Sequence, residues 1–293
     1  MAIGAQILKD QMAHHVLIMA TTLLAVGLTP ASLLGTDGII SVRMRTRVQP
    51  FHHEGAETDA YFDGVIQPSR TAIVITDMWD QHWCMGATRR VGEIALKMEP
   101  VLEQARKAGV LIIHAPSDTM NFYQNSSARL LAQNAPHATP PPELNIQDGP
   151  LPTDDSDGGC DTPGDKEHQA WTREISTLTI APGDVVSDNG SEIYNVIQEH
   201  HIDTILMMGV HANMCILNRS FGIRQMVKWG IRCILVRDLT DAMYNPASRP
   251  FVSHAEGTEL VIQFIERHWA PTTTSADLLK GLGSASGFVG NSR

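Results

Sequence analysis

Cysteine and aromatic residues are scarce in this chain of 293 residues. Aromatic residues make up 5%, and the four cysteines are Cys84, Cys160, Cys215 and Cys233. So few cysteines exclude a disulfide-rich scaffold, and no CxxC or zinc-finger spacing occurs. In an oxidising compartment Cys84 and Cys160 could pair, which the sequence leaves open. Cys233 lies inside an apolar run and is expected in the core, so Cys215 is the cysteine that deserves a functional interpretation.

Positive charge is also in short supply. The chain has 22 Lys and Arg against 32 Asp and Glu, which gives a formal net charge of −10. This balance disfavours nucleic acid and anionic membranes as partners, because phosphate binding needs a basic face. A content of 43% hydrophobic residues, with both signs of charge, indicates a globular protein. We therefore predict a small-molecule substrate and no nucleic-acid partner.

The sequence has no apolar run that is long enough for a stable membrane span. Residues 16–28, VLIMATTLLAVGL, are uncharged but short, with Lys9 before them and Ala31–Ser32 after them. This pattern is similar to a secretory signal peptide, so residues 1–35 predict export to the periplasm or the medium. The alternatives are a buried helix or an anchor that is not cleaved.

The rest of the chain suggests one domain with attached segments. Residues 36–70 are expected to form an N-terminal arm, with an exposed or edge strand followed by irregular chain. Residues 71–270 form the main domain, in which residues 116–180 are an insertion rich in Pro, Asp and Gly. A loop of that length is functional or disordered, so we consider a substrate lid and a surface decoration equally. Residues 271–293 read as a flexible, frayed tail.

Apolar runs alternate with helical patterns along the main domain. This alternation predicts an α/β fold in three layers: a doubly wound, mostly parallel sheet with helices on both faces. The strands near Thr71, Val110, Thr204 and Ile231 should be central and adjacent. The expected helices include residues 88–108, in which Pro100 would kink or divide the helix, and residues 215–229.

Two side chains with reactive groups follow these strands. Asp77 comes directly after the run ending at Thr76, and Cys215 begins a helix after the strand that Gly209 ends. In open parallel sheets, ligands bind outside the carboxyl ends of the strands, so both residues should face one crevice. A helix N-terminus favours thiolate over thiol. Asp77 and Cys215 are therefore the candidate catalytic base and nucleophile.

The segments IVITDMWDQHWC, AGVLIIHAPSD, GDVVSDNG, ILMMGVHANMCIL and CILVRDLTDA resemble the isochorismatase-like cysteine hydrolases. This superfamily includes nicotinamidase and N-carbamoylsarcosine amidase. The resemblance covers roughly residues 71–268, apart from the insertion. It implies an Asp–Lys–Cys triad in which Asp77 and Cys215 are two members, and a cis peptide between Val210 and His211. It also implies an oxyanion hole from the N–H groups of His211 and Cys215, and a dimer or larger homo-oligomer.

The lysine of that triad has no counterpart, because Ser187, Asp188 and Asn189 stand where it is expected. Arg219 or His211 could supply the missing positive charge. We therefore predict a cysteine-dependent hydrolase of the amidase type, acting on an amide or related C–N bond of a small molecule without a cofactor. The alternative is a non-catalytic binding protein that has kept the fold.

Several further residues are candidates for the site. Trp79, His82, Trp83, His114 and Arg219 are candidates for the substrate pocket, because they lie near the expected strand ends. Asp80, His82 and His114 also have ligand-like chemistry. The resemblance does not extend to the metal-ligand stretch of nicotinamidases, so no metal is predicted and these three are only a secondary possibility.

Overall fold

The computed structural model describes residues 38–51 and 56–286. The predicted signal peptide, residues 1–35, lies outside the described residues. In the described part, no helix has both the length and the apolar character needed to cross a membrane.

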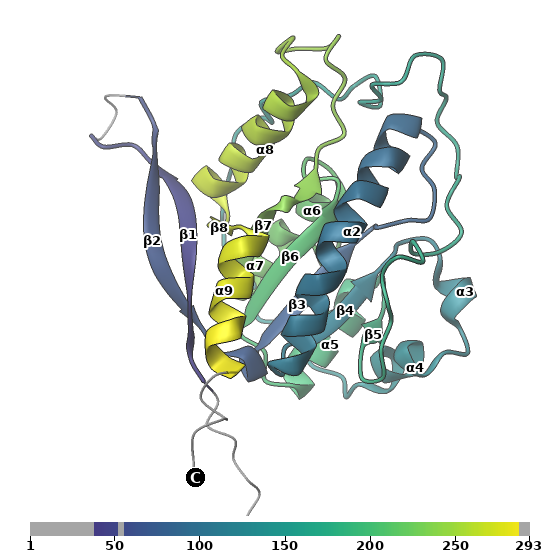
Figure 1. Ribbon diagram of the computed structural model, residues 1–293, viewed down its shortest axis with the longest axis vertical. Helices are drawn as coiled ribbons and strands as arrows, with labels where there is room; N and C mark the ends of the chain where they lie inside the picture. The colour runs from purple at the N-terminus through teal and green to yellow at the C-terminus, as the bar shows by residue number, and fades with distance from the viewer. Residues whose placement is uncertain (1–37, 52–55, 287–293) are drawn as a thin grey trace, which may run out of the picture. The chain divides into compact units, whose positions relative to one another are not determined.

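One eight-stranded sheet organises the chain, in the order β2-β1-β8-β7-β6-β3-β4-β5 (Figure 1). All neighbouring pairs from β8 to β5 are parallel, whereas β1 is antiparallel to both β2 and β8. The prediction that β7, β6, β3 and β4 are central and adjacent is confirmed. The strands are β1 Ile40–Val48, β2 Thr58–Ile66, β3 Thr71–Thr76, β4 Leu111–Ala115, β5 Val185–Val186, β6 Thr204–Val210, β7 Arg232–Asp241 and β8 Thr272–Thr273.

Helices cover both faces of the sheet, as an all-apolar strand requires. All six residues of β3 are buried, and Ile73 and Ile75 join one core whereas Ala72 and Val74 join the other. The first core includes α2 (Met85–Lys107) and α9 (Ser275–Ser286). The second includes residues of α4 (Ser127–Asn134), α5 (Gly190–Glu199), α6 (Cys215–Asn218), α7 (Ile223–Lys228) and α8 (His254–His268). The predicted three-layer α/β fold is confirmed.

Two segments near the ends of the described residues have more regular structure than the sequence suggested. Part of the segment expected to be irregular forms β2, which pairs with β1 along nine residues. The prediction of a frayed tail is wrong for α9, where Leu278 and Leu282 enter the core beside α2. Both errors arise because these segments are stabilised by distant partners, as in the pairing of Arg45 with Thr272.

The helix expected over residues 215–229 is broken. Helix α6 ends at Asn218, Arg219 has an extended ψ of 156°, and α7 begins after Gly222. A Cβ atom at Gly222 would lie 2.9 Å from the Ile216 carbonyl oxygen. Helix α2, in contrast, continues through Pro100 and begins before the expected Thr88.

The insertion after β4 contains α3 (Met120–Tyr123), α4 and a long return segment. A disulfide between Cys84 and Cys160 fastens this segment to the start of α2. Trp171 stacks on Trp79 at a centroid distance of 4.0 Å. The insertion is therefore attached to the domain at several points.

We expect Cys160→Ser to destabilise the protein by about 3–4 kcal/mol, because the disulfide closes a long loop in the unfolded chain. The two cysteines are 76 positions apart. Chemical denaturation with and without reductant measures the loss. Reductant should not affect the Cys160→Ser variant further, and a wild-type protein insensitive to reductant would contradict the bond.

Candidate functional site

The ends of β3 and β6 bring the two predicted catalytic residues together. Thr76 is in register with Gly209, so Asp77 and the turn to Cys215 leave the sheet side by side. A Cβ atom at Gly209 would lie 2.1 Å from the Thr76 carbonyl oxygen, and the φ of Gly209 is +108°. Only glycine allows β6 to approach β3 so closely there.

Asp77 is fully buried and holds three groups. Its Oδ1 accepts a hydrogen bond of 2.8 Å from the Ser117 N–H, and its Oδ2 accepts one of 3.2 Å from Arg219 Nε. The Cys215 thiol is close enough to this carboxylate to lower its pKa, while Asp77 in turn raises the pKa of the thiol. Asp77 has a φ of +48°, an uncommon value for a residue with a side chain, of a kind that clusters at functional sites.

Arg219 supplies the positive charge next to this pair. Among the described residues it is the only basic side chain that forms an ion pair with Asp77. Its Nη2 also lies 3.4 Å from Asp118, a more exposed carboxylate. The expectation that no lysine stands beside Asp77 holds for the same residues.

The structure does not support a standing thiolate at Cys215. Burial raises the pKa of the Cys215 thiol well above its ordinary value and Asp77 raises it further, against lowering by Arg219 and by the His211 N–H. Burial likewise raises the pKa of Asp77, opposed first by Arg219. Helix α6 is only four residues long, so its dipole is too weak to offset burial and a neighbouring carboxylate. Burial and the neighbouring carboxylate therefore oppose the thiolate that the helix N-terminus was expected to favour.

The turn from β6 to α6 contains the predicted cis peptide, between Val210 and His211. The backbone N–H of His211 is close enough to the Cys215 sulfur to lower the pKa of the thiol. Burial lowers the pKa of His211 to about 3, so its imidazole is neutral, and Nε2 has no hydrogen-bond partner. Of the two cations that the sequence offered, Arg219 is the charged group and His211 contributes only its backbone.

A cavity of about 500 Å³ opens at Cys215. It is lined by residues of the insertion and of the Cys215 turn: Leu151, Asp155, Asn213, Met214, Cys215, Asn218 and Arg219. Of the five residues predicted for the substrate pocket, Arg219 is in this lining and Trp79, His82, Trp83 and His114 are not. Asp155 was missed, since nothing in a Pro- and Asp-rich segment shows which carboxylate returns to the site.

The predicted aromatic residues pack against the insertion instead. Trp79 stacks on Trp171 and donates from Nε1 to the Ser117 carbonyl oxygen at 3.0 Å. His82 stacks on Trp79 and Trp171, at centroid distances of 5.9 and 5.7 Å, and its ring is tilted against that of Trp83 at 5.3 Å. These rings fix the insertion beside the crevice.

The secondary metal candidates are not brought together in the described residues, and each has other partners. Asp80 accepts hydrogen bonds from the Thr172 N–H and hydroxyl. His82 Nδ1 accepts from the Cys84 N–H. His114 lies between Glu174 and Asp184, at 2.7 and 3.2 Å.

His114 makes stability depend on pH. Burial alone would lower its pKa, but Glu174 and Asp184 outweigh burial and raise the pKa from 6.5 to about 9. The resulting stabilisation is fully present below pH 6.5 and is lost as the pH rises through 9. Between these values we expect the free energy of unfolding to fall by on the order of 3 kcal/mol, since one pKa unit corresponds to about 1.4 kcal/mol. Urea unfolding of wild-type and His114→Gln proteins at pH 6 and 9.5 measures this, and equal pH dependence in both would contradict it.

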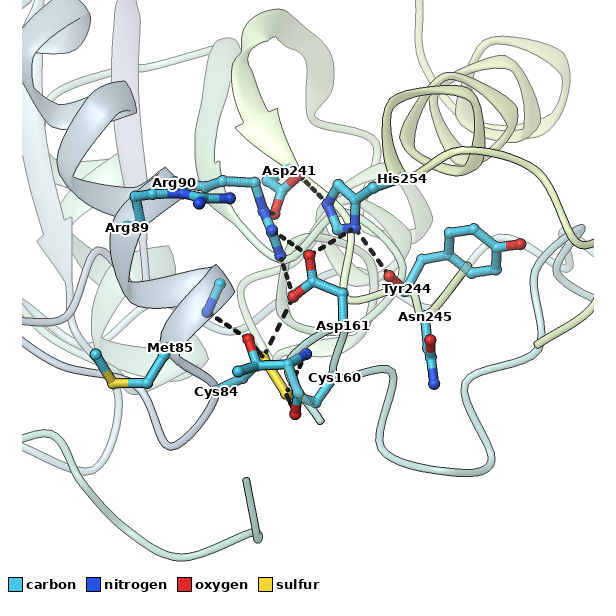
Figure 2. Close-up of polar contacts among 12 residues, drawn as sticks. Cys84, Met85, Arg89, Arg90, Cys160, Asp161, Asp241, Tyr244, Asn245 and His254 are labelled. Carbon is cyan, nitrogen blue, oxygen red and sulfur yellow. Dashed lines mark hydrogen bonds and ion pairs between the residues drawn. A yellow bond between two sulfur atoms is a disulfide. The ribbon is translucent and has the colours of Figure 1, made fainter. Parts of the chain in front are cut away.

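A second polar network lies beside the disulfide (Figure 2). Arg90 forms ion pairs with Asp161 at 2.6 Å and with Asp241 at 2.8 Å. His254 Nδ1 donates to the Tyr244 carbonyl oxygen at 2.9 Å, and Nε2 lies 2.8 Å from Asp241 Oδ1. Burial opposes ionisation of Asp241, but His254 and Arg90 lower its pKa to about 2. Because Asp161 follows Cys160 directly, this network anchors the insertion to α2, β7 and α8.

No protein-family model and no curated protein matches the sequence. Solved structures are similar to it. A cysteine hydrolase from Pseudomonas syringae pv. phaseolicola 1448A is 20% identical, with a TM-score of 0.49, over 75% of this chain and 95% of that one. An isochorismatase from Pseudomonas putida KT2440 is 16% identical, with a TM-score of 0.44, over 72% and 91%. N-carbamoylsarcosine amidase from Thermoplasma acidophilum is 14% identical, with a TM-score of 0.40, over 70% and 96%.

At these identities and TM-scores the likeness assigns no role to any residue.

Proposed function

We propose that this protein is a cysteine hydrolase that cleaves an amide or related C–N bond of a small molecule. The observation that carries the proposal is that buried Asp77 is paired with Arg219 and lies beside Cys215, while Cys215 and Arg219 line an open cavity. A nucleophile, a base in contact with it and a charge that orients the base are the parts that covalent acyl transfer needs.

In the first half of the reaction, Asp77 accepts the thiol proton while the Cys215 sulfur attacks the substrate carbonyl carbon. The N–H groups of His211 and Cys215 stabilise the negative oxygen that forms. The raised pKa of Asp77 suits this task, because a carboxylate with a higher pKa is a stronger base. The intermediate collapses when the C–N bond breaks and Asp77 returns the proton to the leaving nitrogen.

The second half releases the acyl group. Asp77 deprotonates a water molecule, whose oxygen attacks the thioester carbon, and the C–S bond breaks as the sulfur regains a proton. Arg219 keeps the buried Asp77 available as an anion between the steps, which is the role that the resemblance gives to a lysine. Its planar guanidinium is anchored on both Asp77 and Asp118.

We also propose export and self-association. The Cys84–Cys160 disulfide supports an oxidising compartment. Among the strands of the described residues, β2 pairs only with β1, and it exposes Tyr61, Phe62 and Val65, which supports association of copies along this edge. Light scattering of the purified protein tests the second of these.

Intact-mass measurement during turnover tests the hydrolase proposal. A panel of small amides is incubated with the protein, and the reaction is quenched in acid to preserve thioesters. We expect an added acyl mass on the peptide containing Cys215, together with release of the amine. A panel with neither product nor adduct would favour the non-catalytic binding protein.

A further inference from the structure

We infer that Asp155 selects substrates that carry a cationic amine or guanidinium group. This inference rests on the proposed function, because the ligand is a substrate only if the protein is a hydrolase. Asp155 belongs to the insertion, yet it lines the cavity that opens at Cys215. The insertion thus brings a carboxylate to the chamber where the scissile bond would lie.

The turn that carries Cys215 holds this carboxylate in place. Asn213 is buried and donates from Nδ2 to Asp155 Oδ2 at 2.8 Å. Asn213 is itself fixed by Met243, whose N–H donates to Oδ1 at 2.8 Å and whose carbonyl accepts from Nδ2 at 3.0 Å. An amide leaves the negative charge of Asp155 intact, so the side chain is oriented but not neutralised.

The charges in the cavity favour a cation. Arg219 is the basic residue of the lining, and it is already paired with Asp77 and Asp118. Within residues 38–51 and 56–286, no basic side chain forms an ion pair with Asp155. A carboxylate without a counterion attracts the opposite charge, and the low-dielectric walls of a cavity strengthen that attraction relative to bulk water.

The neighbouring carboxylates of the same segment, Asp154 and Asp157, form hydrogen bonds elsewhere. Asp157 Oδ2 accepts from Asn245 Nδ2 and from the Ser248 hydroxyl, and its Oδ1 accepts from the Gly159 N–H. Asp154 is exposed and accepts from the Ser156 N–H. Asp155 is the one of the three that lines the cavity.

The apolar residues of the lining indicate what lies between the two polar ends of the ligand. Leu151 and Met214 line the same cavity and can cover a short alkyl chain. We therefore assign to this pocket a small amide with its carbonyl at Cys215 and a short alkyl spacer that ends in an ammonium or guanidinium group at Asp155.

Charged thiol reagents test the inference without a known substrate. The rates at which cationic aminoethyl and anionic sulfonatoethyl methanethiosulfonates modify Cys215 are each divided by the rate with free cysteine. We expect the cationic reagent to be favoured about tenfold in the wild-type protein, by the order of one unscreened charge. The preference should fall severalfold in Asp155→Asn and as salt is added. Cys215→Ala identifies the labelled site.

Asp154→Asn is the matched control, since it removes the same charge one residue away and outside the cavity, and it should keep the wild-type preference. Calorimetric binding of butylammonium and butyrate gives a second measurement that needs no reaction at Cys215. We expect butylammonium to bind more tightly than butyrate, and Asp155→Asn to weaken butylammonium binding at least fivefold.

Equal charge preference and equal butylammonium binding in wild-type and Asp155→Asn proteins would overturn the assignment of Asp155. This outcome is distinct from a failure of the hydrolase proposal. A protein that forms no acyl adduct but binds cations through Asp155 would be a binding protein for amines, with the same selectivity.

Discussion

Replacing Cys215 with alanine is expected to lower the rate of amide hydrolysis at least ~10⁴-fold, because no other group could form the covalent intermediate. The Cys215 sulfur lies beside Asp77 and the His211 N–H, and alanine removes this reacting atom. Turnover of an amide identified by the mass experiment measures the loss. Unchanged stability of the variant would show that the fold is intact.

The matched control is Cys233→Ala. Cys233 is a free, buried cysteine in the core between the sheet and the helices α4 to α8, and its thiol donates to the Ile231 carbonyl oxygen. Its replacement should cost about 1 kcal/mol of stability and leave the turnover rate unchanged. If both cysteine variants kept full activity, the covalent mechanism would be refuted.

Asp77→Asn should reduce hydrolysis about 10³-fold while the protein still folds, because an amide can accept the Ser117 N–H but cannot take the thiol proton. In the wild-type protein we expect the rate to rise with pH as Asp77 becomes ionised, since its pKa is raised by burial. Asn at this position should abolish that limb of the pH profile. Steady-state rates between pH 4 and 9 measure both effects.

Asp118→Asn gives the control for charge. Asp118 contacts the same guanidinium as Asp77, but it is largely exposed and, among the described residues, forms no hydrogen bond with Cys215. Its replacement should change the rate by less than about tenfold, because exposed ion pairs contribute little. A larger loss for Asp118→Asn than for Asp77→Asn would mean that the base has been misassigned.

The central part of this fold could be predicted from local sequence. The run TAIVIT is apolar at nearly every position, as a strand buried on both faces must be, and an aspartate directly after it has to lie at the sheet edge. The same logic placed Cys215 after β6. The topology of a parallel sheet therefore predicts that Asp77 and Cys215 lie close together.

Contacts between segments that are distant in the sequence could not be predicted from local patterns. Strand β8 has two residues and exists because it pairs with both β1 and β7, which no local pattern can show. The pKa of the Cys215 thiol likewise depends on burial and on Asp77, which is distant in sequence. The position of Cys215 at a helix start therefore could not predict it. Asp155 reaches the site because Asn213 and the nearby disulfide position the insertion, so composition could not distinguish it from Asp154.

The interruption between α6 and α7 shows how Gly222 helps to place the guanidinium of Arg219. Arg219 leaves the first helix in an extended conformation and reaches Asp77, and the chain re-enters a helix only after Gly222. The space beside Gly222 is already filled by the backbone of Ile216 and Leu217. A single methyl group there would push the two short helices apart and carry the guanidinium with them. The charge distribution at Cys215 thus depends partly on Gly222, which has no side chain and does not line the cavity.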